Sequence, residues 1–406
     1  MSDRARSEII IGVDAGTSGV KVSAFAPGSS WRRTCLREYP LLQPEPGRFV
    51  QDPDAILRAT GEALADCVAG IGSAEVIAVS VSAGMHALLG LDRDGRPVTG
   101  LVTWADARAV DEARDLHGSG EAAALHELSG TPVHPMSPLT KLRWFVHHEP
   151  ETVARARWWI DLKALLLQWL TGTLVTELSS ASGSGLLDMS TRSWSPRALD
   201  VAGISADRLP PIEPTTAVRP LAAATAERVG LPAGTPVVLG AADGPLGNLG
   251  AGALAPGVAG LSLGTSGAVR VLVDEPRVDA DHTLFCYALT ESAWVLGGAI
   301  SNGGSVVRWA GDTFLGSGST GEPTGQGDVD DALIELAATA PAGCDGLVML
   351  PYLLPPRAPL WDADLSGAYL GVRREHGRAH FARAAIEGAG LTVAGSAPDP
   401  DVVATL

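Results

Sequence analysis

Two short segments of this chain have the composition of a phosphate-binding loop. The sequence Gly-Thr-Ser-Gly occurs at 16–19 and again at 264–267. Glycines let the backbone approach a phosphate closely, and the hydroxyls of Thr and Ser add donors to the backbone N–H groups. Asp14 precedes the first copy and could hold Mg²⁺, while Lys21 follows it and could neutralise phosphate charge. The pair of loops predicts a site for a nucleotide, although either copy alone is typical of a simple turn.

Asp243 is the leading candidate for a catalytic base. Phosphoryl transfer to an alcohol needs a carboxylate near the attacking hydroxyl group. Asp243 follows the apolar run 237–240, lies between small residues and shortly precedes the second loop. An aspartate at such a boundary is also a common helix N-cap, and this alternative stays open.

Two further segments carry groups that could orient a polyhydroxylated acceptor. Met85-His86 follows a predicted strand, and Trp104-Ala-Asp-Ala-Arg108 places an aromatic ring, a carboxylate and a guanidinium close together. Each segment has a structural alternative. A lone histidine is usually structural or exposed, and an Asp-x-Arg pair usually forms a local salt bridge.

A series of short strands and helices must position these segments. The apolar run 9–13, a glycine-rich turn and the alternating run 21–25 predict a β-hairpin around the first loop. Asp52-Pro53 predicts a helix start, because Asp caps helices and Pro suits the first helical position. The other expected elements are a strand at 76–81, a buried helix at 162–170 ended by Gly172, a loop at 179–185, and strands at 237–240, 259–263 and 269–273. This mixture indicates an α/β protein.

The second loop repeats the setting of the first. Each copy follows a short apolar strand and precedes another β-like run. The repetition predicts a duplicated architecture with one loop in each half. A chain of 406 residues is also too long for one ordinary core. We therefore expect a first domain at 1–242 and a second domain at 243–406.

The composition excludes several classes of partner. With 46% hydrophobic residues, 19% charged residues and a net charge of -16, the chain is expected to bury a core and to repel nucleic acid and anionic membranes. Its four cysteines form no CxxC motif, so each is expected to be a small buried residue rather than a metal ligand. No signal peptide or membrane-spanning run is evident, so the expected compartment is the cytoplasm. The sequence leaves a homodimer open.

Taken in order, the motifs resemble those of the FGGY carbohydrate kinases. Any one motif is weak, but the ordered set is specific and extends from about residue 9 to about residue 391. The resemblance implies an actin-like ATPase (ribonuclease H-like) fold with two α/β domains and an active site in the cleft between them. The segments that carry it are Asp14-Ala-Gly-Thr-Ser-Gly-Val-Lys21, Gly84-Met-His86, Trp104-Ala-Asp-Ala-Arg108, Lys141-Leu-Arg-Trp144, Ala242-Asp-Gly244, Leu263-Gly-Thr-Ser-Gly267 and Leu350-Pro-Tyr-Leu-Leu-Pro-Pro-Arg-Ala-Pro-Leu-Trp361.

The resemblance also implies Mg-ATP as phosphoryl donor and a sugar-like acceptor. It implies that Asp243 takes the proton from the attacking hydroxyl and that Asp14 lies near Mg²⁺. The implied acceptor contacts are Met85, His86, Trp104 and Asp106. The implied ATP and phosphate contacts are Gly16, Thr17, Ser18 and Lys21 in the first loop, Gly264, Thr265 and Ser266 in the second, and Gly303 and Gly304 beyond it.

Within the family, the chain is most similar to gluconate kinases. The segments that suggest this are Thr103-Trp-Ala-Asp-Ala-Arg-Ala109, Ser182-Gly-Ser-Gly-Leu-Leu-Asp188, Gly264-Thr-Ser-Gly-Ala-Val-Arg270 and Gly298-Ala-Ile-Ser-Asn-Gly-Gly304. Gluconate carries a carboxylate, for which Arg270 and Arg108 are both candidate partners. The alternative is a xylulokinase-like pentulose kinase, since xylulokinases share the Met-His pair and the Asp-Gly site. An actin-like or chaperone-like ATPase without a small acceptor would have no use for the Met-His and Trp-x-Asp-x-Arg sets.

The resemblance ends soon after Leu391, where a linker-like run begins at Val393. Family members continue beyond this point with a glycine-rich adenine-binding motif and its flanking helices. We therefore expect the C-terminal part of the second domain to be missing. The consequences would be weak ATP affinity, low stability and, as a further alternative, a catalytically impaired sugar-binding remnant.

Overall fold

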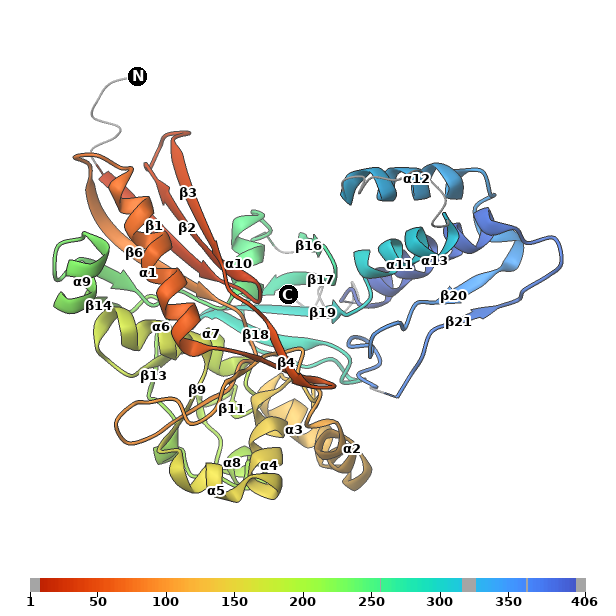
Figure 1. The fold of residues 1–406 in the computed structure, drawn as a ribbon. Helices are drawn as coiled ribbons and strands as arrows, with labels where there is room; N and C mark the ends of the chain where they lie inside the picture. Colours follow the sequence, from red (N-terminus) through yellow and green to blue (C-terminus); the bar gives the residue numbers. More distant parts are fainter. Residues whose placement is uncertain (1–7, 256, 316–325, 363, 399–406) are drawn as a thin grey trace. The chain divides into compact units, whose positions relative to one another are not determined.

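The computed structural model describes residues 8–255, 257–315, 326–362 and 364–398. The chain divides into two compact units. The first comprises residues 1–250, 273–278 and 286–295, and the second comprises 251–272, 279–285 and 296–406. Both contain strands and helices (Figure 1), which confirms the α/β class. The expected domain boundary at 242–243 remains a prediction.

A six-stranded sheet forms the core of the first unit. Its strand order is β14-β15-β6-β1-β2-β3. Strands β15, β6 and β1 run parallel, whereas β2, β3 and β14 are antiparallel to their neighbours. The bounds are β1 Glu8–Ala15, β2 Gly19–Phe25, β3 Arg32–Glu38, β6 Glu75–Ala83, β14 Val218–Pro220 and β15 Pro236–Val238.

The β1–β2 hairpin confirms the element predicted around the first loop. Strand β1 alternates between buried and exposed residues, so Ile9, Ile11 and Val13 all point into the core. Its register pairs Asp14 with Lys21 across the turn. The loop therefore lies at the carboxyl end of a central strand.

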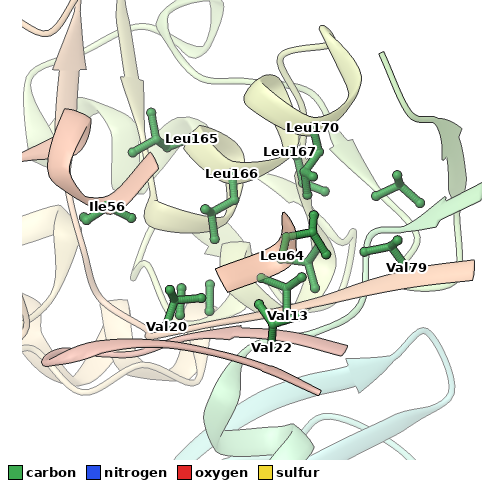
Figure 2. Packing of buried hydrophobic residues seen from close by; sticks show 14 of the residues in the cluster. Val13, Val20, Val22, Ile56, Leu64, Val79, Leu165, Leu166, Leu167 and Leu170 are labelled. Atoms are coloured by element: carbon green, nitrogen blue, oxygen red, sulfur yellow. The ribbon is translucent and has the colours of Figure 1, made fainter. Parts of the chain in front are cut away.

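Helices α1 (Pro53–Ala69) and α6 (Leu162–Thr171) pack their apolar side chains on the sheet. Figure 2 shows Ile56 and Leu64 of α1 and the leucines of α6 around the valines of β1, β2 and β6. Burying each such side chain contributes about 1.5–3 kcal/mol. The predicted ends are confirmed, because the Asp52 side chain accepts the Asp54 N–H and left-handed Gly172 closes α6.

The remainder of the first unit consists of small sheets and short helices. A second apolar cluster there includes Leu142, Phe145 and Trp159. The elements are β4 Leu42–Glu45, β5 Arg48–Gln51, β7 Leu89–Leu91, β8 Leu101–Val102, α2 Val110–Ser119, α3 Glu121–Ser129, α4 Pro138–His148, α5 Pro150–Arg155, β9 Trp158–Ile160, β10 Thr176–Glu177, α7 Leu178–Ser182, β11 Leu187–Asp188, β12 Ser193–Trp194, α8 Pro196–Ala202, η2 Ala206–Arg208, β13 Ile212–Glu213, α9 Ala223–Val229 and α10 Asp243–Gly250.

Helix α7 corrects one prediction. Small polar residues at 179–185 favoured a loop, but Leu178–Ser182 is helical. The side chain of Glu177 accepts the backbone N–H groups of Ser179 and Ser180 and so starts the helix. Two capping bonds to one buried carboxylate outweigh the weak helix propensity of serine.

A further sheet has four strands in the order β16-β17-β19-β18, and the helices of the second unit form a core of their own. Strands β16 and β17 pair antiparallel on either side of the second loop, so the repeated strand–loop–strand unit is confirmed. The bounds are β16 Ala259–Leu263, β17 Gly267–Val273, β18 Phe285–Thr290, β19 Ala293–Ile300, α11 Gly304–Phe314, α12 Gln326–Ala338, η3 Cys344–Gly346, β20 Val348–Leu350, β21 Ala368–Leu370 and α13 Arg378–Gly395.

The described residues also bear on the cysteines and on membrane insertion. All four cysteines are free; Cys67, Cys286 and Cys344 are buried and Cys35 is half-buried. None of the helices in the described ranges is long and apolar enough to cross a bilayer.

Candidate active site

Three parallel segments of the first unit bring polar residues to one edge of the sheet. The register pairs Asp14 at the end of β1 with Ser82 near the end of β6. An isolated parallel bridge then joins Ala83 to Ala242, which follows β15 and precedes Asp243. The carboxyl ends of parallel strands are where open α/β sheets bind ligands. The sheet order therefore gathers at one edge two residues that lie far apart in the sequence, Asp14 and Asp243.

Asp14 is an exposed carboxylate with a neighbouring hydroxyl group. Ser82 donates its O–H to Oδ1 of Asp14 over 2.8 Å. Within the described ranges, no three His, Cys, Asp or Glu residues are grouped closely enough to hold a metal ion by themselves. A cation here would therefore need additional oxygens from phosphate or water, which is the coordination that Mg²⁺ prefers.

The first loop is held in place through its carbonyl groups. The Tyr39 hydroxyl donates to the Gly16 carbonyl over 2.7 Å, and the Gln51 side chain donates to the Thr17 carbonyl over 2.6 Å. The backbone N–H of Tyr39 donates to the Ser18 carbonyl over 3.2 Å. Burial, and secondarily the charge of Asp14, raise the pKa of Tyr39, so its hydroxyl remains a donor. Two side chains and one backbone N–H from outside the loop therefore hold its backbone in place.

Asp243 is exposed and is the first residue of α10. Its Oδ1 accepts the N–H of Gly244 over 2.7 Å. A Cβ atom placed on Gly84 would lie 3.9 Å from Oδ2 of Asp243 and 3.9 Å from the Cα of Gly16. The carboxylate thus lies beside both the first loop and the Gly-Met-His segment. The helix-start alternative and the base assignment are compatible, because one carboxylate oxygen serves the helix and the other faces this segment.

Met85 and His86 lie over the small residues that follow α7. His86 has the left-handed φ of 64°, and its Nδ1 lies 2.8 Å from the Gly183 carbonyl oxygen. A Cβ atom on Gly183 would come within 2.3 Å of the Met85 Cε, so the glycine makes room for that side chain. The ring of Tyr287 meets His86 edge-on with 5.6 Å between centroids.

Asp106 and Arg108 form a buried salt bridge. The Asp106 side chain is 0% exposed and the Arg108 side chain 7% exposed. Asp106 accepts the Phe49 N–H over 2.7 Å as well as three N–H groups of Arg108. The guanidinium also stacks 5.0 Å from the Trp144 ring centroid. These contacts favour the local salt bridge that the sequence left open, and they occupy the groups that an acceptor would use.

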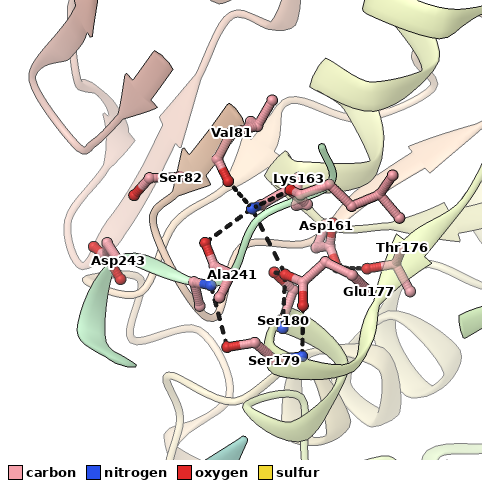
Figure 3. Close-up of polar contacts among 12 residues, drawn as sticks. Val81, Ser82, Asp161, Lys163, Thr176, Glu177, Ser179, Ser180, Ala241 and Asp243 are labelled. Atoms are coloured by element: carbon pink, nitrogen blue, oxygen red, sulfur yellow. Dashed lines mark hydrogen bonds and ion pairs between the residues drawn. The ribbon is translucent and has the colours of Figure 1, made fainter. Parts of the chain in front are cut away.

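Two lysines in the first unit are fully buried, and the sequence assigned a role to neither. Lys141 Nζ donates to the carbonyls of His86 and Thr103 over 2.6 and 2.7 Å. Lys163 Nζ donates to three carbonyls close to Asp243 (Figure 3). The sequence signal that could have identified Lys163 is a charged residue in the mostly apolar helix pattern at 162–170, because a charge buried there must be paired.

The second loop lies in the second unit, where it contacts the start of α11. The Gly304 N–H donates to the Gly264 carbonyl over 2.7 Å, and the N–H groups of Gly303 and Ser305 donate to Thr265 over 3.3 and 3.1 Å. A Cβ atom on Gly304 would lie 2.7 Å from the Gly264 carbonyl oxygen. A glycine-rich loop at the positive end of an eleven-residue helix suits an anionic ligand.

Comparison with known proteins identifies the family. The chain matches the FGGY family of carbohydrate kinases, the N-terminal domain at 9–250 and the C-terminal domain at 259–395. It is 36% identical over 384 residues to a gluconokinase of Bacillus licheniformis, covering 93% of this chain and 74% of that protein. It is 30% identical over 385 residues to a xylulose kinase of Bacillus subtilis strain 168, with the same coverage of 93% and 74%.

Two solved structures are similar throughout. A gluconate kinase from Lactobacillus acidophilus gives a TM-score of 0.89 at 34% identity, covering 96% of this chain and 77% of that chain. A ligand-bound xylulose kinase from the same organism gives 0.88 at 35% identity, covering 95% and 76%. The fold is thus that of a two-domain carbohydrate kinase. The chain belongs to the FGGY family of carbohydrate kinases and is a sugar kinase.

The comparison also corrects the expectation of a missing C-terminal part. The match to the C-terminal domain extends over 259–395, so this domain of the family is present in the chain. The prediction ended the resemblance soon after Leu391 because the following residues contain none of the short motifs on which it depended. In the structure, residues up to 395 belong to the long helix α13, which packs against α11, α12 and β20.

Proposed function

We propose that this kinase transfers the γ-phosphoryl group of Mg-ATP to a hydroxyl group of a sugar acid, D-gluconate, to give 6-phosphogluconate. The observation that carries the proposal is the carboxylate of Asp243 beside the first loop and the Gly84-Met85-His86 segment. The similarity to gluconokinases at 34–36% identity supports the choice of acceptor.

In the proposed reaction, Asp243 is the general base. Its carboxylate accepts the proton of the attacking hydroxyl, whose oxygen forms a bond to the γ-phosphorus while the bond from that phosphorus to the bridging oxygen of ADP breaks. General-base catalysis of this kind contributes about 10²–10⁴-fold in rate. The exposure of Asp243 and its place at a sheet edge are what such a base requires.

The oxygens near the first loop fit a magnesium–phosphate group. The carboxylate of Asp14 and the hydroxyl of Ser82 are hard ligands at the carboxyl ends of neighbouring strands. Gly16, Thr17, Ser18 and Lys21 would contact the transferring phosphates, and bound Mg²⁺ would neutralise charge that develops on them. The chain's own task is to hold these groups rigid, which the bonds to the loop carbonyls accomplish.

We assign the nucleotide side to the second loop and to the start of α11. Gly264, Thr265 and Ser266 offer backbone and hydroxyl donors, and Gly303 and Gly304 allow the backbone to come close to the nucleotide. The packing of Gly304 on Gly264 supports this assignment, because it joins the loop to a helix N-terminus. We likewise propose that 1–242 binds the acceptor and 243–406 the nucleotide.

Met85, His86 and Trp104 are the proposed acceptor contacts. Asp106 is expected to act indirectly, because it holds the Arg108 side chain and the backbone N–H of Phe49. For the gluconate carboxylate, Arg270 and Arg108 remain the two candidate arginines. Arg108 is already paired with Asp106 and stacked on Trp144.

A pentulose kinase is the second candidate, favoured by the similarity to xylulose kinases. Gluconate, xylulose, ribulose and glycerol should be compared in one coupled assay with Mg-ATP. We expect the highest kcat/KM with gluconate, and a loss of about 10³-fold or more in the Asp243→Asn variant. A higher kcat/KM with xylulose would favour the pentulose kinase. Equal rates for wild type and Asp243→Asn would reject Asp243 as the base.

A further inference from the structure

The ammonium group of Lys163 joins two segments of the active-site edge. Its Nζ donates to the carbonyl of Val81 on one segment and to the carbonyls of Leu239 and Ala241, over 3.0 and 2.9 Å, on the other (Figure 3). An ammonium has three N–H donors, so these three bonds use all of them. All three donors of Lys163 therefore bind backbone carbonyls, and none is left to bind a substrate.

The three carbonyls lie next to residues of the proposed chemistry. Val81 directly precedes Ser82, which binds Asp14, and Ala241 lies two residues before Asp243. Between them, Gly240 has a φ of 71°, and a Cβ atom there would come 2.0 Å from the Val81 carbonyl oxygen. Only glycine allows the two segments to approach this closely, and the lysine bridges them where they do so.

A second contact holds the backbone immediately before Asp243. The Ala242 N–H donates to Oγ of Ser179 over 3.1 Å. Ser179 is in turn held by Glu177, whose carboxylate accepts the Ser179 N–H over 2.5 Å and the Ser180 N–H over 3.1 Å. The residues just before Asp243 are thus fixed at a carbonyl by Lys163 and at an N–H by Ser179.

Lys163 and Glu177 also form a buried ion pair, with Nζ 3.7 Å from Oε1 and side chains 1% and 0% exposed. Burial lowers the pKa of Lys163 and raises the pKa of Glu177, while each charge opposes the shift of the other. A buried pair of this kind is often no more stabilising than apolar residues of similar volume. Stability alone therefore does not explain why this ion pair is present. Its explanation is that Lys163 places three carbonyl groups and Glu177 places the start of α7.

We propose that Lys163 and Glu177 are positioning residues that fix the backbone of 239–242 and thereby aim the carboxylate of Asp243 at the attacking hydroxyl group. The inference rests on the proposed role of Asp243. A general base must lie within hydrogen-bonding reach of the proton that it accepts. A displacement of about 1 Å can cost about 10²-fold in rate.

The first test is the Lys163→Met variant, which keeps the length of the side chain and removes its charge and donors. We expect kcat to fall about 10²-fold while the KM values for ATP and acceptor change less than about threefold. In the Asp243→Asn background, the same substitution should lower kcat no further, because the base that it positions is already absent. Unchanged kcat in the single variant, or additive losses in the double variant, would overturn the proposal.

A milder variant avoids the risk that Lys163→Met fails to fold. Ser179→Ala removes only the acceptor of the Ala242 N–H, and we expect about a tenfold loss of kcat. The matched control is Ser129→Ala, since Ser129 is equally buried and its Oγ accepts the Thr131 N–H over 3.1 Å. The control should shift Tm similarly and leave kcat within about twofold of wild type. Equal effects of the two serine variants on kcat would contradict the proposal.

Hydrogen exchange provides a readout that does not depend on activity. In Ser179→Ala and Lys163→Met, amides of the peptide 239–244 should exchange faster than in wild type, while peptides of α1 exchange at the wild-type rate. Unchanged exchange at 239–244 would overturn the positioning role. If wild type phosphorylated no acceptor of the panel, the proposed function would fail, and the exchange rates would still decide whether the two residues order this segment.

Discussion

The indole N–H of Trp104 donates to the Thr17 hydroxyl oxygen over 2.9 Å. This single bond joins the proposed acceptor side of the first unit to its phosphate loop. The Gln51 side chain reaches the Thr17 carbonyl from β5, which pairs with β8 shortly before Trp104, so Thr17 is held at two atoms. Acceptor and phosphate contacts are thus expected to depend on each other.

Replacing Thr17 should weaken both sets of contacts. Thr17→Val keeps the shape but removes the acceptor of the Trp104 N–H, which costs about 1–2 kcal/mol for a partly buried donor. We expect KM to rise about 5–30-fold for both ATP and acceptor in steady-state assays. Thr17→Ser, which keeps the hydroxyl, should stay within about threefold of wild type. A change in only one of the two KM values would show that the bond does not couple the sites.

Asp106 should matter for stability more than for acceptor contact. Asp106→Ala leaves the buried Arg108 guanidinium without its partner, which should lower the free energy of unfolding by about 3–5 kcal/mol. A matched control exists at Asp94-Gly-Arg96, where the same spacing places side chains that are 68% and 76% exposed. Asp94→Ala should cost less than about 1 kcal/mol. Urea denaturation of both variants measures the difference, and equal losses would contradict the structural role of Asp106.

Lys141 should make stability depend on pH. Burial lowers the pKa of Lys141 to about 7. The unfolded chain keeps the ordinary, higher value, so between pH 7 and 10 it binds more protons than the folded chain. The free energy of unfolding should therefore rise with pH in this window, by up to about 1.4 kcal/mol per pH unit. A neutral amine still has two N–H donors, enough for the carbonyls of His86 and Thr103.

The contribution of Lys141 can be isolated with the Lys141→Met variant. Urea denaturation at several pH values from 7 to 10 should show the difference between wild type and variant changing in favour of wild type as the pH rises. Below pH 7 both states of wild type are protonated, so the difference should become constant. Parallel curves across the whole range would show that the lysine titrates normally in the folded protein.

Gly304→Ala should affect the nucleotide and not the acceptor. The added Cβ would lie 2.7 Å from the Gly264 carbonyl oxygen, so the second loop must move away from the start of α11. We expect KM for ATP to rise about tenfold or more, with KM for the acceptor changed less than about threefold. Gly390→Ala is the control, because a Cβ at this position in α13 has open space around it. An unchanged KM for ATP in Gly304→Ala would contradict the assignment of this loop.

Much of the local structure could be predicted from residues close together in the chain. The hairpin around 16–19, the helix start at Asp52 and the helix end at Gly172 were all predicted correctly, because glycine, aspartate and alternating apolar residues act on their own neighbours. The helix at 178–182 was missed, since its capping carboxylate, Glu177, looks like any other surface acid in sequence.

The sequence by itself determined the two loops, the residue types that could serve the chemistry and, through the ordered motifs, the family. The tertiary structure decided which of those residues meet. It placed Asp243 beside the first loop, committed Asp106 to Arg108 and brought Lys163 to carbonyls of two segments more than seventy residues away. The physical reason is that hairpins and caps form between neighbours, whereas a buried charge is satisfied only by groups that the strand order of the sheet brings to it.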